Sequence, residues 1–430
     1  MIRAKDNSTV LVPTSENLDH LRWLAQCPIG KLGADEGGGL LVFPQSFDEY
    51  GDKIAEEYIF SVNDEGVIQT GNIMGFIGYK GTEISICSRF AQGDNDYFLH
   101  YMLQRVFAVN LFDLKHDFNK ESVFDFLIFL FPAFLKRVLR QGLYKEYQSR
   151  QYNNDHIKGR IDVNRHIKHN IPFSGKVAYT TREYSFDNKV TQLIRHTIEY
   201  IASLPLGDSI LNSDEETKEA VATINSATTS YQRNDRYHVI SQNLRPTAHP
   251  YYVDYRDLQR LCLQILRHEK IKYGADKEQV YGVLFDGAWL WEEYLGTILS
   301  GFKHPRNKKG QGRRYLFTDD SGWCFPDFYN DQMVLDAKYK GYDDWNKVQR
   351  DDLYQVITYL HILKLIHGGF IVPVSNSMKQ TTAKTLNGFG GQLSIFGLNV
   401  DLPAKSFNDY VSQILLEEQR LQSLISSCCQ

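Results

Sequence analysis

Two aspartates and a lysine towards the C-terminal end have the types and spacing of a centre that binds a divalent metal ion. Asp336 follows Asp327 by nine residues, and Lys338 completes an Asp-Ala-Lys tripeptide. Residues 323–328 and 332–340 are rich in aromatic and branched side chains, and the segment between them is turn-like. We therefore predict an antiparallel hairpin, in which Asp336 and Lys338 share a face.

The turn of this hairpin decides where the first aspartate lies. A two-residue loop at 330–331 would set Asp327 opposite Val334. Strand alternation then puts Asp327 on the face that carries Asp336 and Lys338. As diagonal neighbours, the two carboxylates would lie about 7 Å apart at the backbone, so they could hold one divalent ion.

Two carboxylates with open water positions suit Mg²⁺, and Mn²⁺ as its substitute. The ion would lower the pKa of a bound water and stabilise charge on a scissile phosphate, while Lys338 would orient that water or offset the phosphate charge. An Asp-x-Lys tripeptide alone is more often a solvated surface feature. Pro326 before the first acid, the apolar run 333–335 before the second and a helix about a dozen residues later favour the nuclease interpretation.

The longer pattern resembles a known nuclease signature. Phe-Pro-Asp ending at Asp327, followed by Asp336-Ala337-Lys338, is similar to the PD-(D/E)XK motif. Gln355 and Tyr359 match the Gln-x-x-x-Tyr pair of RecB-like members of that superfamily. One helical turn separates them, so both can face one groove. The resemblance therefore implies that both line the site.

A second resemblance lies upstream of the hairpin. Residues 290–295, Leu-Trp-Glu-Glu-Tyr-Leu, resemble the opening helix of the nuclease domain in McrC proteins, the endonuclease components of McrBC-type 5-methylcytosine restriction systems. Glu292 matches the helix acid of that family. It is either a third metal-site carboxylate or a solvated residue beside Glu293. At Ser88-Arg89 the sequence departs from the family, which tends towards Pro-Lys.

Membership of the McrC-like family implies a partner. A separate McrB-like AAA+ GTPase ring would recognise modified double-stranded DNA and translocate it, while this chain would bind the ring, stimulate its GTPase and cut. The chain has no Gly-x-x-x-x-Gly-Lys-Ser/Thr motif, so GTP would enter only through the partner. Two other functions fit the same residues: a non-catalytic adaptor that activates the motor, and a stand-alone DNA nuclease.

Charge restricts where DNA could bind. The formal net charge of −4 provides no overall attraction to nucleic acid, so contact with DNA requires a local basic patch. The segment 303–314 is basic and contains no acid. It is either a solvated loop or a clamp on the DNA backbone. Its basic residues are Lys303, Arg306, Lys308, Lys309, Arg313 and Arg314.

Cysteine usage and hydropathy favour a cytoplasmic protein without a membrane partner. The 6 cysteines lack metal-ligand spacing and are expected to be thiols in a reducing compartment. The first residues lack the apolar core of a signal peptide. The longest apolar run, 126–135, is too short to span a bilayer.

The length of 430 residues predicts two or three domains. We expect an α+β multidomain chain with a small β-rich N-terminal domain at 1–95, a candidate for partner binding. A mostly helical middle domain at 96–278 and an α/β nuclease domain of the PD-(D/E)XK type at 279–430 would follow. Helix, hairpin, helix and strand alternate in the last range, which predicts a mixed sheet flanked by helices.

Overall fold

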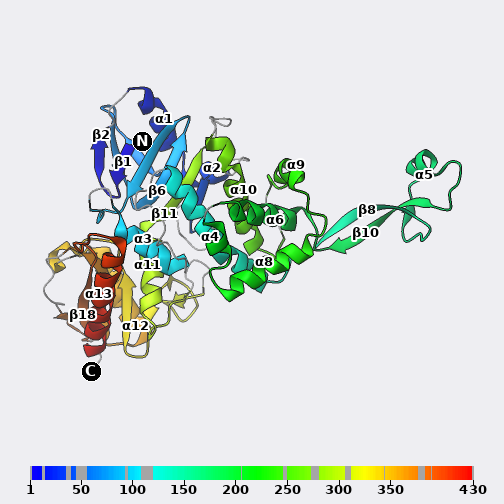
Figure 1. The fold of residues 1–430 in the computed structure, drawn as a ribbon. Helices are drawn as coiled ribbons and strands as arrows, with labels where there is room; N and C mark the ends of the chain where they lie inside the picture. Colours follow the sequence, from blue (N-terminus) through cyan, green and yellow to red (C-terminus); the bar gives the residue numbers. More distant parts are fainter. Residues whose placement is uncertain are drawn as a thin grey trace. The chain divides into compact units, whose positions relative to one another are not determined.

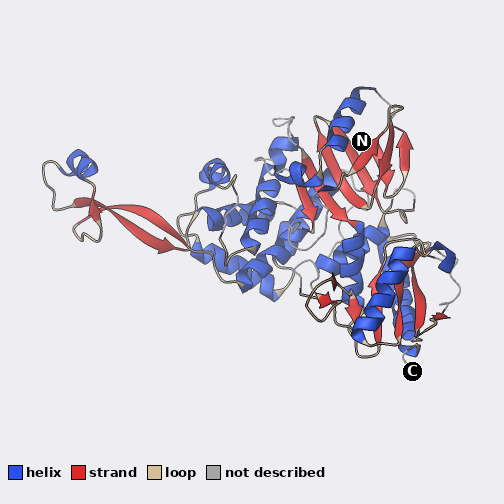
Figure 2. Cartoon of the chain, turned by 180° about the vertical axis from the view of Figure 1, so that it is seen from behind, coloured by secondary structure: helices blue, strands red, loops and turns tan. Residues whose placement is uncertain are grey.

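The computed structural model has an α+β fold with several sheets (Figures 1 and 2). Two compact units divide the chain: unit 1 joins Met1–Phe129 to Gly274–Gln430, and unit 2 is Leu130–Tyr273. The three domain ranges given above stay a prediction. The structure describes residues 2–11, 15–34, 40–44, 56–92, 95–107, 120–204, 206–245, 249–272, 280–305, 311–342, 344–375, 383–388 and 390–428.

The N-terminal sheet of unit 1 has the strand order β1-β7-β6-β11-β3. β1 pairs with β7 and β11 with β3 in parallel, and the other two pairs are antiparallel. A second antiparallel sheet has the order β2-β5-β4. The bounds are β1 Ile2–Lys5, β2 Thr9–Leu11, β3 Leu40–Phe43, β4 Phe60–Val62, β5 Val67–Thr70, β6 Ile73–Tyr79, β7 Thr82–Cys87 and β11 Tyr281–Asp286.

β11 comes from far along the chain, yet it lies between β6 and β3. Gly75 and Gly282 allow this close pairing, with φ angles of 124° and 149°. A Cβ atom on Gly75 would lie 2.1 Å from the carbonyl oxygen of Val283, and one on Gly282 would lie 2.1 Å from the carbonyl oxygen of Phe76. Only glycine tolerates both the φ angle and the contact. The first helices, α1 (Ser15–Gln26) and α2 (Ile29–Ala34), contribute to the same core.

The C-terminal sheet of unit 1 is mixed, with the order β14-β15-β16-β18-β17. Its three central strands are parallel and both edge strands are antiparallel. α12 packs on β15 and β16, α11 contacts β15, and α13 packs on β18. The bounds are α11 Gly287–Ile298, β14 Phe328–Tyr329, β15 Met333–Ala337, α12 Arg350–Leu363, β16 His367–Val374, β17 Ala383–Thr385, β18 Gln392–Asn399 and α13 Phe407–Ser427.

Shorter elements surround these sheets in unit 1. α3 spans Tyr97–Phe107, as its apolar spacing predicts, and packs against α11. β12 (Arg314–Tyr315) pairs with β13 (Trp323–Cys324), and a 3-10 helix, η4, spans Trp345–Lys347. The predicted strand at 323–328 is thus divided, because the chain leaves β13 at Phe325-Pro326 before β14 begins.

Unit 2 consists of helices and one long hairpin. α6 begins with a capping box, in which Asn188 accepts from the backbone of Thr191, and packs against α10. α4 ends at Arg140, before the chain enters β8 at Glu146. The helices are α4 Lys120–Arg140, which begins in unit 1, α6 Lys189–Ala202, α7 Gly207–Leu211, α8 Glu215–Ala227, the 3-10 helix η2 Arg233–Asp235, α9 Arg236–Gln242 and α10 Asp254–Lys272.

The hairpin of unit 2 forms an arm that extends from these helices (Figures 1 and 2). β8 (Glu146–Asn154) and β10 (Val177–Ser185) pair over their full length, and β9 (Arg160–Ile161) adds to β10. α5 (Val163–Asn170) lies at the tip. The expectation of a mostly helical middle region did not include this arm.

Two chemical expectations concern the whole chain. Across the described ranges, no helix is both long and apolar enough to cross a membrane. The described cysteines form no disulfide with one another, and Cys429 lies outside the described residues.

Candidate active site

The hairpin turn differs from the predicted one by one residue. The side-chain oxygen of Asn330 accepts the backbone N–H groups of Gln332 and Met333, at 2.9 and 2.8 Å. The Asn330 N–H also donates to the Met333 carbonyl at 3.0 Å. The two-residue loop is therefore 331–332, and the predicted loop at 330–331 is wrong, because this asparagine side chain organises its own turn.

The new turn changes the register of the two carboxylates. Phe328 pairs with Leu335, so the next pair of that register sets Asp327 directly opposite Asp336. The expected position opposite Val334 is wrong by two residues. A shift of two conserves the strand face, so the predicted common face is retained.

Asp327 is held by its backbone and its carboxylate. One carboxylate oxygen accepts the Ala337 N–H at 2.8 Å, which continues the hairpin beyond β14. Nδ1 of His304 lies 3.0 Å from the Asp327 carbonyl oxygen, and the His304 ring stacks on Phe328 with 4.6 Å between centroids. These contacts fix the first carboxylate at the end of β15.

Asp336 is a buried carboxylate with one polar partner among the described residues. Its exposed fraction is 1%, and Nζ of Lys338 lies 2.9 Å from one of its oxygens. The other oxygen accepts no hydrogen bond from any residue that the structure describes. Burial raises the pKa of Asp336 to about 7; the charge of Asp327 raises it too, and Lys338 lowers it. Such a carboxylate is expensive to bury unless a cation binds it.

Glu292 of α11 approaches the same carboxylates. Burial raises the pKa of Glu292 well above its ordinary value, and the charge of Asp327 raises it further. The charge of Asp336 acts in the same direction. Nδ1 of His304 lies 3.9 Å from a Glu292 oxygen. This position favours an auxiliary acid over a purely solvated residue.

The donor set fits a hard cation with few protein ligands. Within the described ranges, no group of three or more His, Cys, Asp or Glu side chains could hold a metal ion by itself. Two facing carboxylates remain, and one oxygen of Asp336 accepts no hydrogen bond from the described residues. Mg²⁺ commonly binds through one or two carboxylates, with waters and substrate phosphates in the other positions.

Lys338 connects the hairpin to α12. Its Nζ donates to Oε1 of Gln355 at 2.9 Å. Nε2 of Gln355 donates to the Tyr359 hydroxyl at 2.5 Å, and that hydroxyl donates to the Phe325 carbonyl oxygen at 2.9 Å. Burial lowers the pKa of Lys338, but Asp336 and the other nearby carboxylates more than offset this, so its pKa is raised. Lys338, Gln355 and Tyr359 thus form one chain of contacts.

Asp352 is a further residue of this cluster that the sequence analysis did not single out. It lies in the first turn of α12 and its exposed fraction is 7%. One oxygen accepts from Nζ of Lys340 at 2.7 Å and from the Tyr342 hydroxyl, and the other lies 3.3 Å from Nζ of Lys338. The available signal was its spacing of three residues before Gln355, which puts both on one helix face.

The basic segment is described at its two ends. Lys303 forms an antiparallel bridge with Tyr329, and Nζ of Lys303 lies 5.9 Å from the centre of that ring. Arg314 lies 5.2 Å from the same ring and donates to its hydroxyl. Arg313 lies 5.6 Å from the ring of Trp323. Arg306, Lys308 and Lys309 lie outside the described residues.

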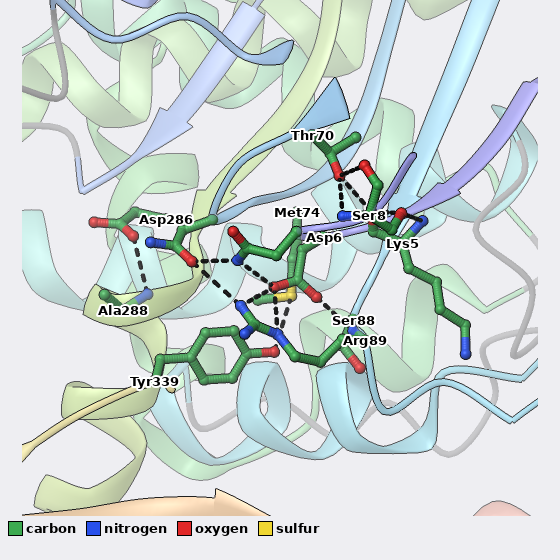
Figure 3. Close-up of polar contacts among 12 residues, drawn as sticks. Lys5, Asp6, Ser8, Thr70, Met74, Ser88, Arg89, Asp286, Ala288 and Tyr339 are labelled. Atoms are coloured by element: carbon green, nitrogen blue, oxygen red, sulfur yellow. Dashed lines mark hydrogen bonds and ion pairs between the residues drawn. The ribbon is translucent and has the colours of Figure 1, made fainter. Parts of the chain in front are cut away.

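The N-terminal sheet supports the end of β15 (Figure 3). Tyr339, which follows Lys338, is buried, and its hydroxyl donates to the sulfur of Met74 at 3.7 Å. Figure 3 shows the Arg89 side chain between Asp6 and the Tyr339 ring. The Arg89 guanidinium carbon lies 4.6 Å from that ring centre, and Arg89 donates to Asp6.

The start of α11 rests on the same sheet. Asp286 accepts from the Ala288 N–H at 2.9 Å, which caps the helix that carries Glu292. The Gly287 N–H donates to the Asn72 carbonyl oxygen at 2.8 Å. The segment that carries Lys338 and the helix that carries Glu292 therefore both contact the N-terminal sheet.

Comparison with known proteins identifies the family. The model of the McrBC 5-methylcytosine restriction system component family matches residues 68–373, more than half of the chain. The proteins of this family are components of restriction systems. The chain belongs to the McrBC family, so the predicted resemblance is confirmed. No curated protein matches the chain.

Two solved structures share low sequence identity with the chain. The first is a refined half-complex from a tetradecameric assembly of Thermococcus gammatolerans McrB AAA+ hexamers with bound McrC. The match has 13% identity and a TM-score of 0.46, and covers 96% of this chain and 99% of that chain. The second is a cryo-EM structure of the Thermococcus gammatolerans McrBC complex, with 12% identity, a TM-score of 0.32 and coverages of 69% and 86%.

Proposed function

We propose that this chain is the DNA endonuclease component of a McrBC-type, modification-dependent restriction system, with a Mg²⁺-dependent site of the PD-(D/E)XK type. The observation that carries the proposal is Asp336. It is buried, faces Asp327, and has Lys338 at 2.9 Å as its one polar partner within the described ranges. A divalent cation would supply a partner for the second oxygen and offset the charge of the two facing carboxylates.

The position of each residue would determine its role in the reaction. Asp336 and Asp327 would hold the ion, and Glu292 would act as an auxiliary acid beside them. Bound Mg²⁺ would activate water and stabilise charge on the phosphate. Lys338 would place its ammonium group at the attacking water or the phosphate. Gln355 donates to Tyr359 and accepts from Lys338, so it would restrict the lysine to that position.

DNA would contact the basic segment next to β14. Lys303 and Arg314 both lie against Tyr329, on the strand that follows Asp327. Cations at this point would bind backbone phosphates and position the scissile bond, without reading sequence. Arg313 would extend the contact, as would Arg306 and the lysines at 308 and 309.

The partner in this proposal is a McrB-like AAA+ GTPase ring, and the arm of unit 2 is the surface we assign to it. Its tip exposes apolar side chains that a lone chain leaves in water, which is typical of a protein contact surface. GTP would be used only by the ring. The exposed residues are Ile157, Ile161, Val163, Ile167, Ile171 and Phe173, with exposed fractions of 46% to 70%.

A cleavage assay with and without the motor tests the function and separates its alternatives. Linear double-stranded DNA is incubated with Mg²⁺ and the wild-type chain, Asp327→Ala or Lys338→Ala, with or without a McrB-like ring and GTP. We expect cleavage that needs the ring and is lost in both variants. Cleavage without the ring would indicate a stand-alone nuclease. GTPase stimulation without cleavage in any mixture would indicate an adaptor and overturn the nuclease proposal.

A further inference from the structure

Two carboxylates from different elements share one lysine. Nζ of Lys338 is 2.9 Å from an Asp336 oxygen on β15 and 3.3 Å from an Asp352 oxygen on α12. Among the described residues, Nζ of Lys338 also donates a hydrogen bond to Oε1 of Gln355, which carries no charge. The position of the ammonium group therefore depends on both acids.

Asp352 is held rigidly by groups other than Lys338. One of its oxygens accepts from Lys340 and from the Tyr342 hydroxyl, and the side chain is buried. Burial raises the pKa of Asp352, but the hydrogen bonds from Lys340 and Tyr342 and the charge of Lys338 more than offset this, so its pKa is lowered. The acid stays charged, and its second oxygen is fixed towards Lys338.

We propose that Asp352 is a positioning residue that keeps Lys338 at the site when Asp336 binds a metal ion. This inference rests on the proposed function. A divalent cation on Asp336 would repel the Lys338 ammonium group and would replace it as the partner of the Asp336 carboxylate. A lysine side chain is long and flexible, and its contact with the neutral Gln355 supplies no charge to oppose this repulsion. The side chain would then turn towards solvent unless a second fixed anion retains it. Asp352 is the anion in the right place.

A simpler role for Asp352 is an acid in the first turn of a helix, where it favours the helix dipole. Asp351 occupies the same turn and is exposed. Asp351→Asn removes the same charge from the same helix end, so it is the matched control. A difference between the two variants separates the contacts of Asp352 with Lys338 and Lys340 from the effect of charge at the helix end.

The first measurement is the kinetics of DNA cleavage by the full chain with its motor, Mg²⁺ and GTP. Asp352→Asn keeps the side-chain size and an oxygen for Tyr342. We expect its kcat to fall about tenfold to a hundredfold with KM for DNA unchanged, because the lysine is misplaced rather than the substrate. Asp352→Glu should recover part of the rate, and Asp351→Asn should match wild type. Equal kcat for Asp352→Asn and wild type would overturn the proposal.

The second measurement determines how accessible the Lys338 amine is to a reagent. The amine of Lys338 is labelled with an acylating reagent and quantified by peptide mass spectrometry, with and without Mg²⁺. In Asp352→Asn we expect Mg²⁺ to increase labelling several-fold, whereas wild type and Asp351→Asn stay protected. Unchanged labelling in Asp352→Asn would refute the role. Equal melting temperatures of the variants establish that the effect is local.

The two proposals fail in different ways. A wild-type chain that neither binds Mg²⁺ nor cuts DNA overturns the nuclease function, and this role with it. A wild-type chain that cuts, beside an Asp352→Asn variant that cuts equally well, overturns the positioning role alone.

Discussion

At the residue scale, Asp336 carries the account, because a buried carboxylate that faces a second carboxylate, with Lys338 as its one polar partner among the described residues, favours the binding of a further cation. The sequence predicts that Asp327, Asp336 and Lys338 share one strand face, because side chains alternate between faces and a shift of the register by two residues leaves the face unchanged. It does not predict the exact register, because the Asn330 side chain bonds two backbone N–H groups and moves the turn. The sequence does not indicate a role for Asp352 in the site, because acids are common in the first turn of a helix.

Metal affinity should depend on pH through Asp336. Its pKa is raised to about 7, so below that pH a proton occupies the carboxylate and the ion must displace it. Affinity for Mg²⁺ or Mn²⁺ should therefore be constant above about pH 8 and fall towards tenfold per unit below pH 7. Calorimetric titration with Mn²⁺ at pH 6, 7 and 8 checks this. Equal affinities at pH 6 and 8 would contradict the assignment of Asp336.

At the element scale, amphipathic helices were predictable and the polar hairpin was not. α3 and α13 have clear apolar periodicity, which indicates a helix in each range. β8, Glu-Tyr-Gln-Ser-Arg-Gln-Tyr-Asn-Asn, pairs with β10, and its residues alternate between half-buried and exposed. Both of its faces carry polar side chains, so the sequence lacks the apolar-polar alternation that identifies half-buried strands.

The exposed apolar side chains of the arm should serve binding rather than folding. Ile161→Ser with Phe173→Ser should leave the melting temperature within about 2 °C, because both side chains are exposed, Ile161 by 46% and Phe173 by 70%. The same change should weaken binding to the McrB-like ring at least tenfold. Thermal unfolding and a pull-down with the ring measure both effects. The reverse pattern, a large loss of stability with full binding, would contradict the assignment of the arm.

A matched control for the arm is available on the same hairpin. Ser149→Ala changes an exposed side chain of β8 that lies opposite Arg182, outside the stretch of the arm where β9 pairs with β10. It should bind the ring as wild type does. Equal loss of binding in this variant would indicate a general disturbance of the arm.

At the scale of the whole molecule, unit 1 is discontinuous in sequence. β11 joins the N-terminal sheet although it precedes the candidate active site by only a few tens of residues. Local patterns cannot show which distant strand a short apolar run will join, because any sheet edge offers the same backbone groups. The sequence identified the family and the order of the site residues, but not this pairing.

A glycine substitution tests that long-range pairing. Gly75→Ala would put a Cβ atom 2.1 Å from the Val283 carbonyl oxygen at a φ of 124°. We expect a loss of about 3 kcal/mol in the free energy of unfolding. Gly71→Ala is the control, because nothing lies within 4 Å of its Cβ position. Equal denaturant midpoints for the two variants would contradict the pairing of β6 with β11.

The most direct test of the central claim is Mg²⁺-dependent cleavage of linear DNA by Asp336→Asn, compared with wild type in the presence of the motor and GTP. The account predicts a loss of at least a hundredfold in the cleavage rate, with GTPase stimulation and the fold retained, because only the ligand for the ion is removed. An Asp336→Asn variant that cuts as fast as wild type would contradict it.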